Sequence, residues 1–240
     1  MHSAFFMFRA LLLTMVFAAP MTLQAQFAED FNDISTLGLA GWFFQNSSEP
    51  VGTTSWFQGN PGVFPAANGA GNAYIGANFE NTLAGGTISN WMLTPVLTLE
   101  DGATFSFFTR ITVDGGVFPD RLELRLSTAG ASTMVGSSAS SVGNFNQLLR
   151  SINPDLAIDG YPDEWTQFSV TLSGIGAPTL GRFGFRYFVT EAGDGGINSN
   201  YIGIDAVSYN RVSVVPEPAS VALMGVGLFG LALVRRRRVR

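Results

Sequence analysis

The stretch Arg121-Leu122-Glu123-Leu124-Arg125-Leu126-Ser127 decides the fold of this chain. Leucine occupies every second position, and the residues between the leucines are charged. Successive side chains of a β-strand point to opposite faces of a sheet, so the pattern predicts a half-buried strand with a core side and a solvent side. The leucine side needs a second layer to bury it, and a second sheet packed face to face supplies that layer.

Comparable strands are predicted on both sides of this stretch, and glycine-rich or proline-rich turns separate them. They cover residues 72–78, 89–95, 103–112, 165–172, 182–190 and 201–209. No segment between the two ends of the chain has the pattern of a long amphipathic helix. The predicted fold class is therefore all-β, a β-sandwich spanning residues 26–211.

Residues 128–163 differ from the rest because they are rich in Ser, Gly and Asn. We expect a short helix around residues 145–151 within them. A connection of this length inside a compact domain is usually a surface excursion or a functional loop.

Composition excludes several kinds of chemistry. The 240-residue chain has no Cys, so disulfides, cysteine–metal sites and thiol nucleophiles are absent. Its single His is His2, at the N-terminus. If a leader that includes His2 is removed, the mature chain has no imidazole for a Ser-His-Asp triad or a histidine zinc site.

The charge of the chain argues against nucleic acid or anionic lipid as a partner of the body. The net charge is −5, and six of the 13 basic residues, all of them Arg, lie at positions 9, 235–238 and 240. The segment between these ends is acidic, which repels phosphate backbones. An acidic exterior suits divalent cations, and it equally suits ordinary solubility.

Residues 1–25 have the pattern of a signal peptide. Arg9 supplies a positive charge, an apolar core follows over Ala10–Ala19, and Ala25 offers a small residue for cleavage. We predict that the mature chain begins at Gln26 and is exported through the inner membrane.

Residues 212–240 contain three elements in order: Pro216-Glu217-Pro218, an apolar run over Ala219–Val234, and Arg235-Arg236-Arg237-Arg238. The two prolines hold Glu217 in an extended, accessible segment. At about 1.5 Å per helical residue, the apolar run just crosses a hydrocarbon core of about 30 Å. The arginine cluster acts as a membrane stop and marks the cytoplasmic side. The pattern predicts a single transmembrane helix with a protease-accessible neck outside the membrane.

This tail resembles the PEP-CTERM sorting signal of Gram-negative bacteria. The resemblance implies that the chain is a substrate of an exosortase, a membrane cysteine peptidase that processes its substrates near the Pro-Glu-Pro. The inner membrane would then hold the protein only transiently. The alternative is a plain C-terminal anchor that is never cleaved.

The body also carries a resemblance, in the order of its motifs. They are Glu29-Asp30-Phe31, Gly41-Trp42, Asn90-Trp91-Met92-Leu93-Thr94-Pro95, Leu122-Glu123-Leu124-Arg125-Leu126-Ser127-Thr128, Arg182-Phe183-Gly184-Phe185-Arg186-Tyr187 and Ile202-Gly203-Ile204-Asp205-Ala206-Val207-Ser208. This order is similar to that of the choice-of-anchor J domain and of cleaved-adhesin and MAM-like jelly rolls. The resemblance implies a jelly-roll β-sandwich that serves in surface adhesion or carbohydrate binding rather than in a defined reaction.

The resemblance further implies a structural calcium between the N-terminal strand and the closing strand. The matching positions are Glu29 or Asp30 and Asp205. Ala206 stands where a second Asp is usual in that pattern. The alternative is that Asp205 is a hydrogen-bonded or solvated Asp beside a turn.

Catalysis is the weaker hypothesis. Asp and Glu are the remaining acid–base candidates, and a glycoside hydrolase needs two of them across a cleft. The adjacent pairs Glu100-Asp101 and Asp163-Glu164 would point apart if they lay in strands. We predict a protein that is not an enzyme, with a carboxylate-based glycoside hydrolase as the alternative.

Aromatic side chains next to loops are the candidates for glycan contact, because an aromatic face buries the apolar C–H surface of a sugar. Trp56 and Tyr161 are predicted to be exposed, whereas Trp42, Trp91 and Trp165 border strands and are predicted to pack in the core. The sequence thus predicts a cell-surface or extracellular-matrix protein that contacts extracellular polysaccharide. A structural matrix component without a ligand is a further alternative.

Overall fold

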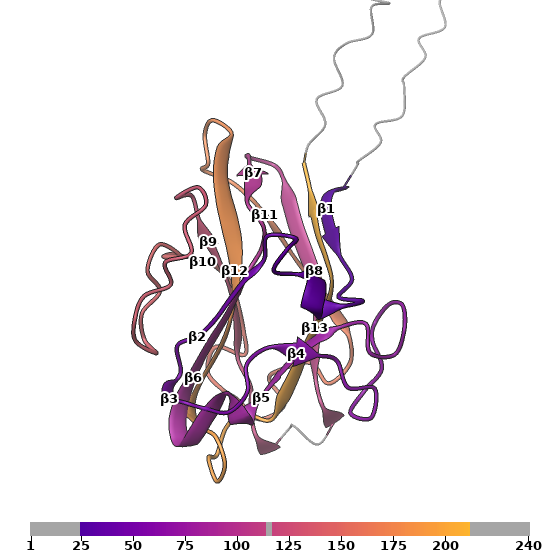
Figure 1. The fold of residues 1–240 in the computed structure, drawn as a ribbon, viewed down its shortest axis with the longest axis vertical. Coiled ribbons are helices and arrows are strands. Elements are labelled where there is room, and N and C mark those ends of the chain that lie inside the picture. The colour runs from indigo at the N-terminus through magenta and orange to yellow at the C-terminus, as the bar shows by residue number, and fades with distance from the viewer. Residues whose placement is uncertain (1–24, 114–116, 212–240) are drawn as a thin grey trace, which may run out of the picture. The chain divides into compact units, whose positions relative to one another are not determined.

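The computed structural model describes residues 25–113 and 117–211, which form a sandwich of two antiparallel sheets (Figure 1). The predicted all-β sandwich is confirmed. The Pro-Glu-Pro motif, the predicted transmembrane helix, the arginine cluster and all of the predicted signal peptide except Ala25 lie outside the described residues. Within the described ranges, no helix is long and apolar enough to cross a membrane.

The six-stranded sheet has the order β11-β8-β13-β5-β4, with β1 paired to β13. Its strands are β1 (Ala25–Glu29), β4 (Phe57–Gln58), β5 (Ile75–Asn78), β8 (Thr104–Ile111), β11 (Thr166–Thr171) and β13 (Tyr201–Asn210).

The seven-stranded sheet has the order β10-β9-β12-β6-β2, with β3 paired to β6 and β7 paired to β12. Its strands are β2 (Phe43–Asn46), β3 (Glu49–Val51), β6 (Thr82–Leu93), β7 (Leu97–Leu99), β9 (Leu122–Ser127), β10 (Gln147–Ile152) and β12 (Thr179–Ala192). Two short 3-10 helices, η1 (Ile34–Thr36) and η2 (Phe79–Asn81), lie in the connections.

The chain crosses repeatedly between the two sheets: from β1 to β2, β3 to β4, β5 to β6, β7 to β8, β8 to β9, β10 to β11, β11 to β12 and β12 to β13. The jelly-roll form of the sandwich stays a prediction, with which these crossings agree. The first and last described strands pair with each other, from Ala25 opposite Asn210 to Glu29 opposite Val207. The described residues 25–113 and 117–211 therefore contain both sheets and the core between them.

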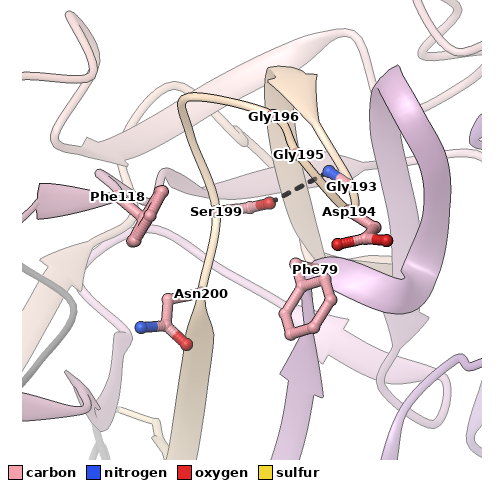
Figure 2. A pocket seen from close by; sticks show the side chains of 8 residues that line it. All are labelled: Phe79, Phe118, Gly193, Asp194, Gly195, Gly196, Ser199 and Asn200. Carbon is pink, nitrogen blue, oxygen red and sulfur yellow. Dashed lines mark hydrogen bonds between the residues drawn. The ribbon is translucent and has the colours of Figure 1, made fainter.

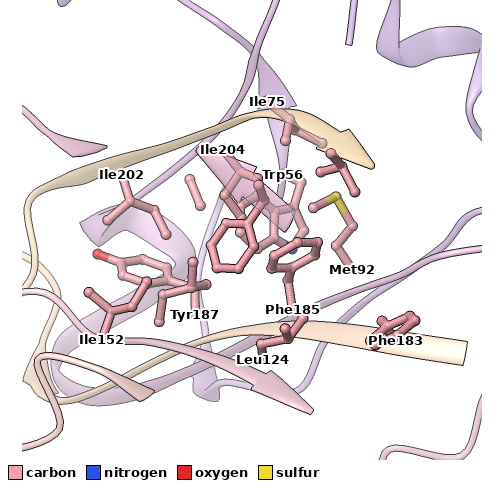
Figure 3. Close-up of a cluster of buried hydrophobic side chains, with 14 of the residues drawn as sticks. Trp56, Ile75, Met92, Leu124, Ile152, Phe183, Phe185, Tyr187, Ile202 and Ile204 are labelled. Atoms are coloured by element: carbon pink, nitrogen blue, oxygen red, sulfur yellow. The ribbon is translucent and has the colours of Figure 1, made fainter. Parts of the chain in front are cut away.

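The core lies where the inner faces of the sheets meet, as Figure 3 shows for residues contributed by both sheets. Phe105 on β8 stacks on Phe183 on β12, with ring centroids 4.0 Å apart, and Phe107 meets Phe185 edge-on at 4.9 Å. The leucines of β9 are buried against the same core. The alternation in the sequence therefore identified the inner faces correctly.

The predicted helix at residues 145–151 is wrong. Residues 147–152 form β10, which pairs antiparallel with β9 from Gln147 opposite Leu126 to Ile152 opposite Leu122. The pattern Gln-Leu-Leu-Arg-Ser-Ile is compatible with either structure, and the free edge of β9 decides the outcome because it supplies backbone partners along the whole segment.

The solvent side predicted for β9 is also wrong. Glu123 is buried, and residues 128–146 cover this face of the seven-stranded sheet. Phe145 packs on Trp91 with ring centroids 5.8 Å apart, and the backbone oxygen of Ala139 accepts a hydrogen bond from Arg186. This excursion therefore gives the outer face a second, smaller core.

Candidate functional site

The candidate site is a groove at one end of the sandwich, where β12 turns into β13. A pocket of about 250 Å³ is lined there by Phe79, Phe118, Gly193, Asp194, Gly195, Gly196, Ser199 and Asn200 (Figure 2). An adjoining pocket of about 550 Å³ shares Phe79 and Asp194 and is completed by Thr53, Glu80, Thr82, Leu83 and Ala84. We call the two pockets together the end groove.

The floor of the end groove is held by the 3-10 helix η2. The N–H of Phe79 donates to the backbone oxygen of Asn200 at 2.9 Å, which ties η2 to the start of β13. Asn81 is fully buried, and its amide donates to Thr54 Oγ1 at 2.7 Å while accepting from Asn90 at 2.8 Å. Asn90 lies in β6 and Asn200 directly precedes β13, so η2, which carries Phe79, is tied to both sheets.

One wall of the groove is the turn from Gly193 to Gly196. Gly193 has φ +88°, and a Cβ there would lie 2.2 Å from the backbone oxygen of Leu83. Only glycine permits both this conformation and this close approach. The N–H of Gly193 donates to Ser199 Oγ, the contact drawn in Figure 2, which closes the turn. The turn therefore presents the Asp194 side chain at the rim.

Behind the groove lies the buried carboxylate of Asp120. Its Oδ1 accepts hydrogen bonds from the Tyr187 hydroxyl and from the N–H of Asn200, the latter at 3.1 Å. Its Oδ2 has no partner among the described residues. Burial raises the pKa of Asp120 to about 7, and the two hydrogen bonds only partly oppose that effect. This carboxylate fixes the backbone of a groove residue from the interior.

The lining of the groove combines apolar rings with oxygen-bearing side chains. Phe118 is 41 % exposed and Phe79 is half-buried, and Glu80, Asp194 and Asn200 add two carboxylates and an amide. None of the lining residues within the described part of the chain is Lys, Arg or His. Aromatic faces can cover apolar C–H surface while the oxygens accept hydrogen bonds from hydroxyl groups. The arrangement suits a hydroxyl-rich, uncharged ligand.

The predicted calcium positions lie near one another without forming a cluster of metal ligands. Asp205 is fully buried, and its carboxylate accepts hydrogen bonds from the N–H groups of Ala67 (2.8 Å), Asn68 (3.1 Å) and Ala206 (2.6 Å). Burial raises the pKa of Asp205 to about 6, the three N–H donors oppose this rise, and the nearby charge of Asp30 adds to it.

Glu29 accepts from the N–H of Phe31 at 2.8 Å. Within the described ranges, no three acidic or His side chains are placed to hold one ion. A calcium ion beside Asp205 would thus need Asp30 together with backbone carbonyls and water. Calcium binding stays a prediction.

The exposure predicted for two aromatic residues is wrong. Trp56 is 8 % exposed and Tyr161 is 3 % exposed, and both belong to the main core. The Tyr161 hydroxyl forms a hydrogen bond with Thr109 Oγ1 at 2.6 Å. A loop position in the sequence did not mean exposure, because both side chains turn inward between the sheets. Tyr161 lines a separate pocket of about 270 Å³ together with Asp159 and Asp163, and glycan contact by Trp56 or Tyr161 stays a prediction.

The adjacent acidic pairs serve local structure or lie exposed. Glu100 pairs with Arg211, and Asp101 accepts from the N–H groups of Ile175 (2.7 Å) and Gly176 (3.1 Å). Asp163 and Glu164 are exposed.

Two carboxylates that the sequence did not single out, Glu80 and Asp194, are the ones that line one pocket. The turn Asp194-Gly195-Gly196 was visible in the sequence. Its neighbours Phe79 and Phe118 come from distant segments and gave no signal.

Comparison with known proteins gives a match at the C-terminus and a shared fold for the body. Residues 214–238 match the PEP-CTERM protein-sorting motif. They include the predicted Pro216, Glu217 and Pro218 and the cluster Arg235–Arg238. A search of curated proteins found no match.

Among solved structures, the K2 cleaved adhesin domain of Lys-gingipain is similar, with a TM-score of 0.50 and 15% identity over 77% of this chain and 99% of that one. The K1 domain, from Porphyromonas gingivalis W83, has a TM-score of 0.48 and 19% identity over 76% and 96% of the two chains. A carbohydrate-binding module of the β-sandwich superfamily has a TM-score of 0.44 and 12% identity over 75% and 62%. At these identities, the likeness to the K2 domain shows a common fold.

Proposed function

We propose that this chain is an exported surface or extracellular-matrix protein whose sandwich binds polysaccharide through the end groove. The observation that carries the proposal is the lining of that groove. Two aromatic rings, two carboxylates and an amide converge there on a rigid glycine turn, with no basic side chain among them. Aromatic faces with hydrogen-bond acceptors between them are what a sugar chain requires.

Binding can be tested with residues 26–211 on a glycan array, followed by affinity electrophoresis in the polysaccharides that score. Phe118→Ala removes an exposed ring, so it should weaken binding about tenfold, or about 1.4 kcal/mol, with little effect on stability. Leu39→Ala is the matched control, because Leu39 is 96 % exposed and does not line the groove. Equal binding by Phe118→Ala and the wild type would contradict the groove as the site.

Export and sorting form the second part of the proposal. A signal peptide over residues 1–25 delivers the body, the apolar segment holds it transiently in the inner membrane, and an exosortase processes it near Pro216-Glu217-Pro218. The support is the match of residues 214–238 to the sorting motif. Mass spectrometry of the mature C-terminus should find it near this motif in exosortase-competent cells. A tail that is intact to Arg240 would contradict the proposal.

A secreted glycoside hydrolase is the second candidate, and one observation favours it. Glu80 and Asp194 line the same pocket, and such enzymes need two carboxylates that face one cleft. Both side chains are exposed, so neither lies in an enclosed apolar site. If the protein releases reducing sugar and Glu80→Gln abolishes that release, the hydrolase is favoured. Binding without turnover favours polysaccharide binding alone.

A further inference from the structure

The loop that joins β4 to β5 carries Asn68-Gly69, the one Asn-Gly pair in the sequence. Both residues are exposed, and Gly69 has φ +81°, a left-handed conformation that glycine adopts without strain. An asparagine loses ammonia when the backbone nitrogen of the next residue attacks the carbon of its side-chain amide. A glycine in that next position favours the attack, because it has no side chain to obstruct the approach.

The structure leaves both reacting groups of this pair free. Among the described residues, neither the N–H of Gly69 nor the side-chain amide of Asn68 has a hydrogen-bond partner, whereas the backbone N–H of Asn68 is held by Asp205. The nitrogen that must attack is therefore not engaged elsewhere. The amide that must leave is in contact with solvent.

Other exposed asparagines are protected in a way that Asn68 is not. Asn72 and Asn144 are exposed too, but the N–H of the residue after each one is already bonded. Ala73 donates to a backbone oxygen at 2.8 Å, and Phe145 does so at 2.9 Å. Ring closure at these sites would have to break a hydrogen bond within the loop, so the geometry singles out residue 68.

We propose that Asn68 deamidates spontaneously in the folded protein. The nitrogen of Gly69 gives its proton to hydroxide and bonds to Asn68 Cγ. The bond from Cγ to Nδ2 breaks, and Nδ2 takes a proton from water and leaves as ammonia, which closes a succinimide ring. Water then opens the ring at one of its two carbonyls and leaves a carboxylate. The product is Asp if the main-chain link is restored and isoaspartate if the link runs through the side chain.

The new carboxylate would arise beside a buried one. The N–H groups of Ala67 and Asn68 donate to Asp205 Oδ2 at 2.8 and 3.1 Å, and Asp205 is fully buried on β13. These two donors tie the loop to the closing strand. A negative charge at position 68 repels that of Asp205, and isoaspartate also adds one carbon to the backbone next to the donors. Either product therefore weakens the attachment of the loop, and the loss of ammonia makes the change irreversible.

Peptide mapping by mass spectrometry tests the reaction. Residues 26–211 are incubated folded and in denaturing urea, at neutral and at mildly alkaline pH. In the folded protein, Asn68 should convert first, no more than about tenfold slower than in urea, and faster at the higher pH because Gly69 must lose a proton. Folding should slow Asn72 and Asn144 more than it slows Asn68.

Asn68→Gln is the matched variant, because it keeps a side-chain amide but would need a larger ring. It should show no conversion at position 68. If folding slows Asn68 as much as it slows Asn72, the loop protects the pair and the proposal is overturned. An Asn68 that stays intact in the folded protein while it converts in urea would have the same meaning.

Urea denaturation tests the consequence for the loop. With chelator present, so that no cation offsets the new charge, Asn68→Asp should unfold at a lower urea concentration than Asn72→Asp. Both variants make the same change in net charge on exposed residues of one loop, and only position 68 donates to Asp205. Asn68→Gln should unfold like the wild type. Equal midpoints for the two Asp variants would show that the product does not disturb Asp205 and would overturn this part of the proposal.

Discussion

The guanidinium of Arg186 donates from Nη1 to Glu123 Oε2 at 3.1 Å, and only 2 % of the Arg186 side chain is exposed. The same guanidinium lies 3.6 Å from the centre of the Phe188 ring and donates from Nε to Ser89 Oγ at 3.0 Å. Burial lowers the pKa of Arg186 to about 10, against the opposing influence of Glu123, so the group stays charged at neutral pH. A buried ion pair therefore lies on the face that the sequence indicated to be solvent.

Glu123→Ala should lower the free energy of unfolding by about 3–5 kcal/mol, because it leaves the Arg186 charge buried without its carboxylate partner. Urea denaturation of residues 26–211 at pH 7 measures the change. Glu164→Ala removes an exposed carboxylate and should cost less than about 0.5 kcal/mol. A loss below about 1 kcal/mol in Glu123→Ala would show that the pair is not buried as described.

The burial of Glu123 also shows which features of the structure the sequence could predict and which it could not. The alternation in residues 121–127 placed β9 and its inner leucines correctly, because a strand pattern depends only on neighbouring residues. It could not show that residues 128–146 fold back over the charged side, since that segment has no periodicity. For the same reason, residues 145–151 were predicted to be a helix, although the edge of β9 makes residues 147–152 a strand.

The candidate site was less predictable than the fold. The turn at Asp194-Gly195-Gly196 is a local signal, because an Asp followed by two glycines is typical of a turn. Phe79 and Phe118 join it only because η2, β12 and β13 meet at one end of the sandwich, which depends on the register of distant strands. Trp56 and Tyr161 failed in the opposite way. Their loop positions predicted exposed side chains, but both side chains are buried in the core.

Asp120 should make stability fall as the pH rises from about 4 to 7. Burial raises its pKa to about 7, whereas an unfolded Asp titrates near 3.9. Between these values the folded state holds more protons than the unfolded state, so the free energy of unfolding decreases with pH by up to about 1.4 kcal/mol per pH unit. Urea midpoints measured across this range test the slope.

Asp120→Asn keeps a neutral side chain of the same size and should flatten that slope. A smaller slope of the same sign should remain, because burial also raises the pKa of Asp205 to about 6. If the wild type and Asp120→Asn lose stability equally with rising pH, Asp120 does not carry a raised pKa.

Calcium should raise the melting temperature of residues 26–211 if it binds at Asp205 and Asp30. An ion at ten times its dissociation constant adds about 1.4 kcal/mol, which corresponds to about 3–5 °C for a domain of this size. This stabilisation would arise because the cation relieves the repulsion between Asp30 and Asp205, which contributes to the raised pKa of Asp205. Differential scanning calorimetry with calcium and with a chelator measures the shift.

Two variants separate the calcium prediction from the hydrogen bonds that Asp205 already makes. Asp30→Asn keeps the Asp205 carboxylate and its N–H donors, so it should remove the calcium shift while leaving the calcium-free melting temperature nearly unchanged. Asp101→Asn, on a carboxylate that also accepts two N–H groups, should leave the shift intact. A melting temperature that changes with neither calcium nor chelator would contradict the prediction. Asp205 would then serve only to accept hydrogen bonds from the N–H groups of residues 67 and 68.

The end groove should distinguish neutral from anionic polysaccharides. Glu80 and Asp194 line it without a basic neighbour among the lining residues, so a polyanion meets uncompensated repulsion there, whereas a neutral chain does not. In affinity electrophoresis, residues 26–211 should be retarded by a neutral glucan that scores on the array and pass alginate unretarded at low salt. Asp194→Asn should gain retardation in alginate and keep at least a tenth of its affinity for the neutral chain.

Asp155→Asn makes the same change in net charge at an exposed site that does not line the groove, so it isolates the local effect. It should behave as the wild type in both polysaccharides. Added salt should reduce the difference between wild type and Asp194→Asn, because exposed charges are screened within about 8 Å at physiological ionic strength. If Asp155→Asn gains alginate binding as strongly as Asp194→Asn does, the selectivity belongs to the overall charge of the protein and not to the groove.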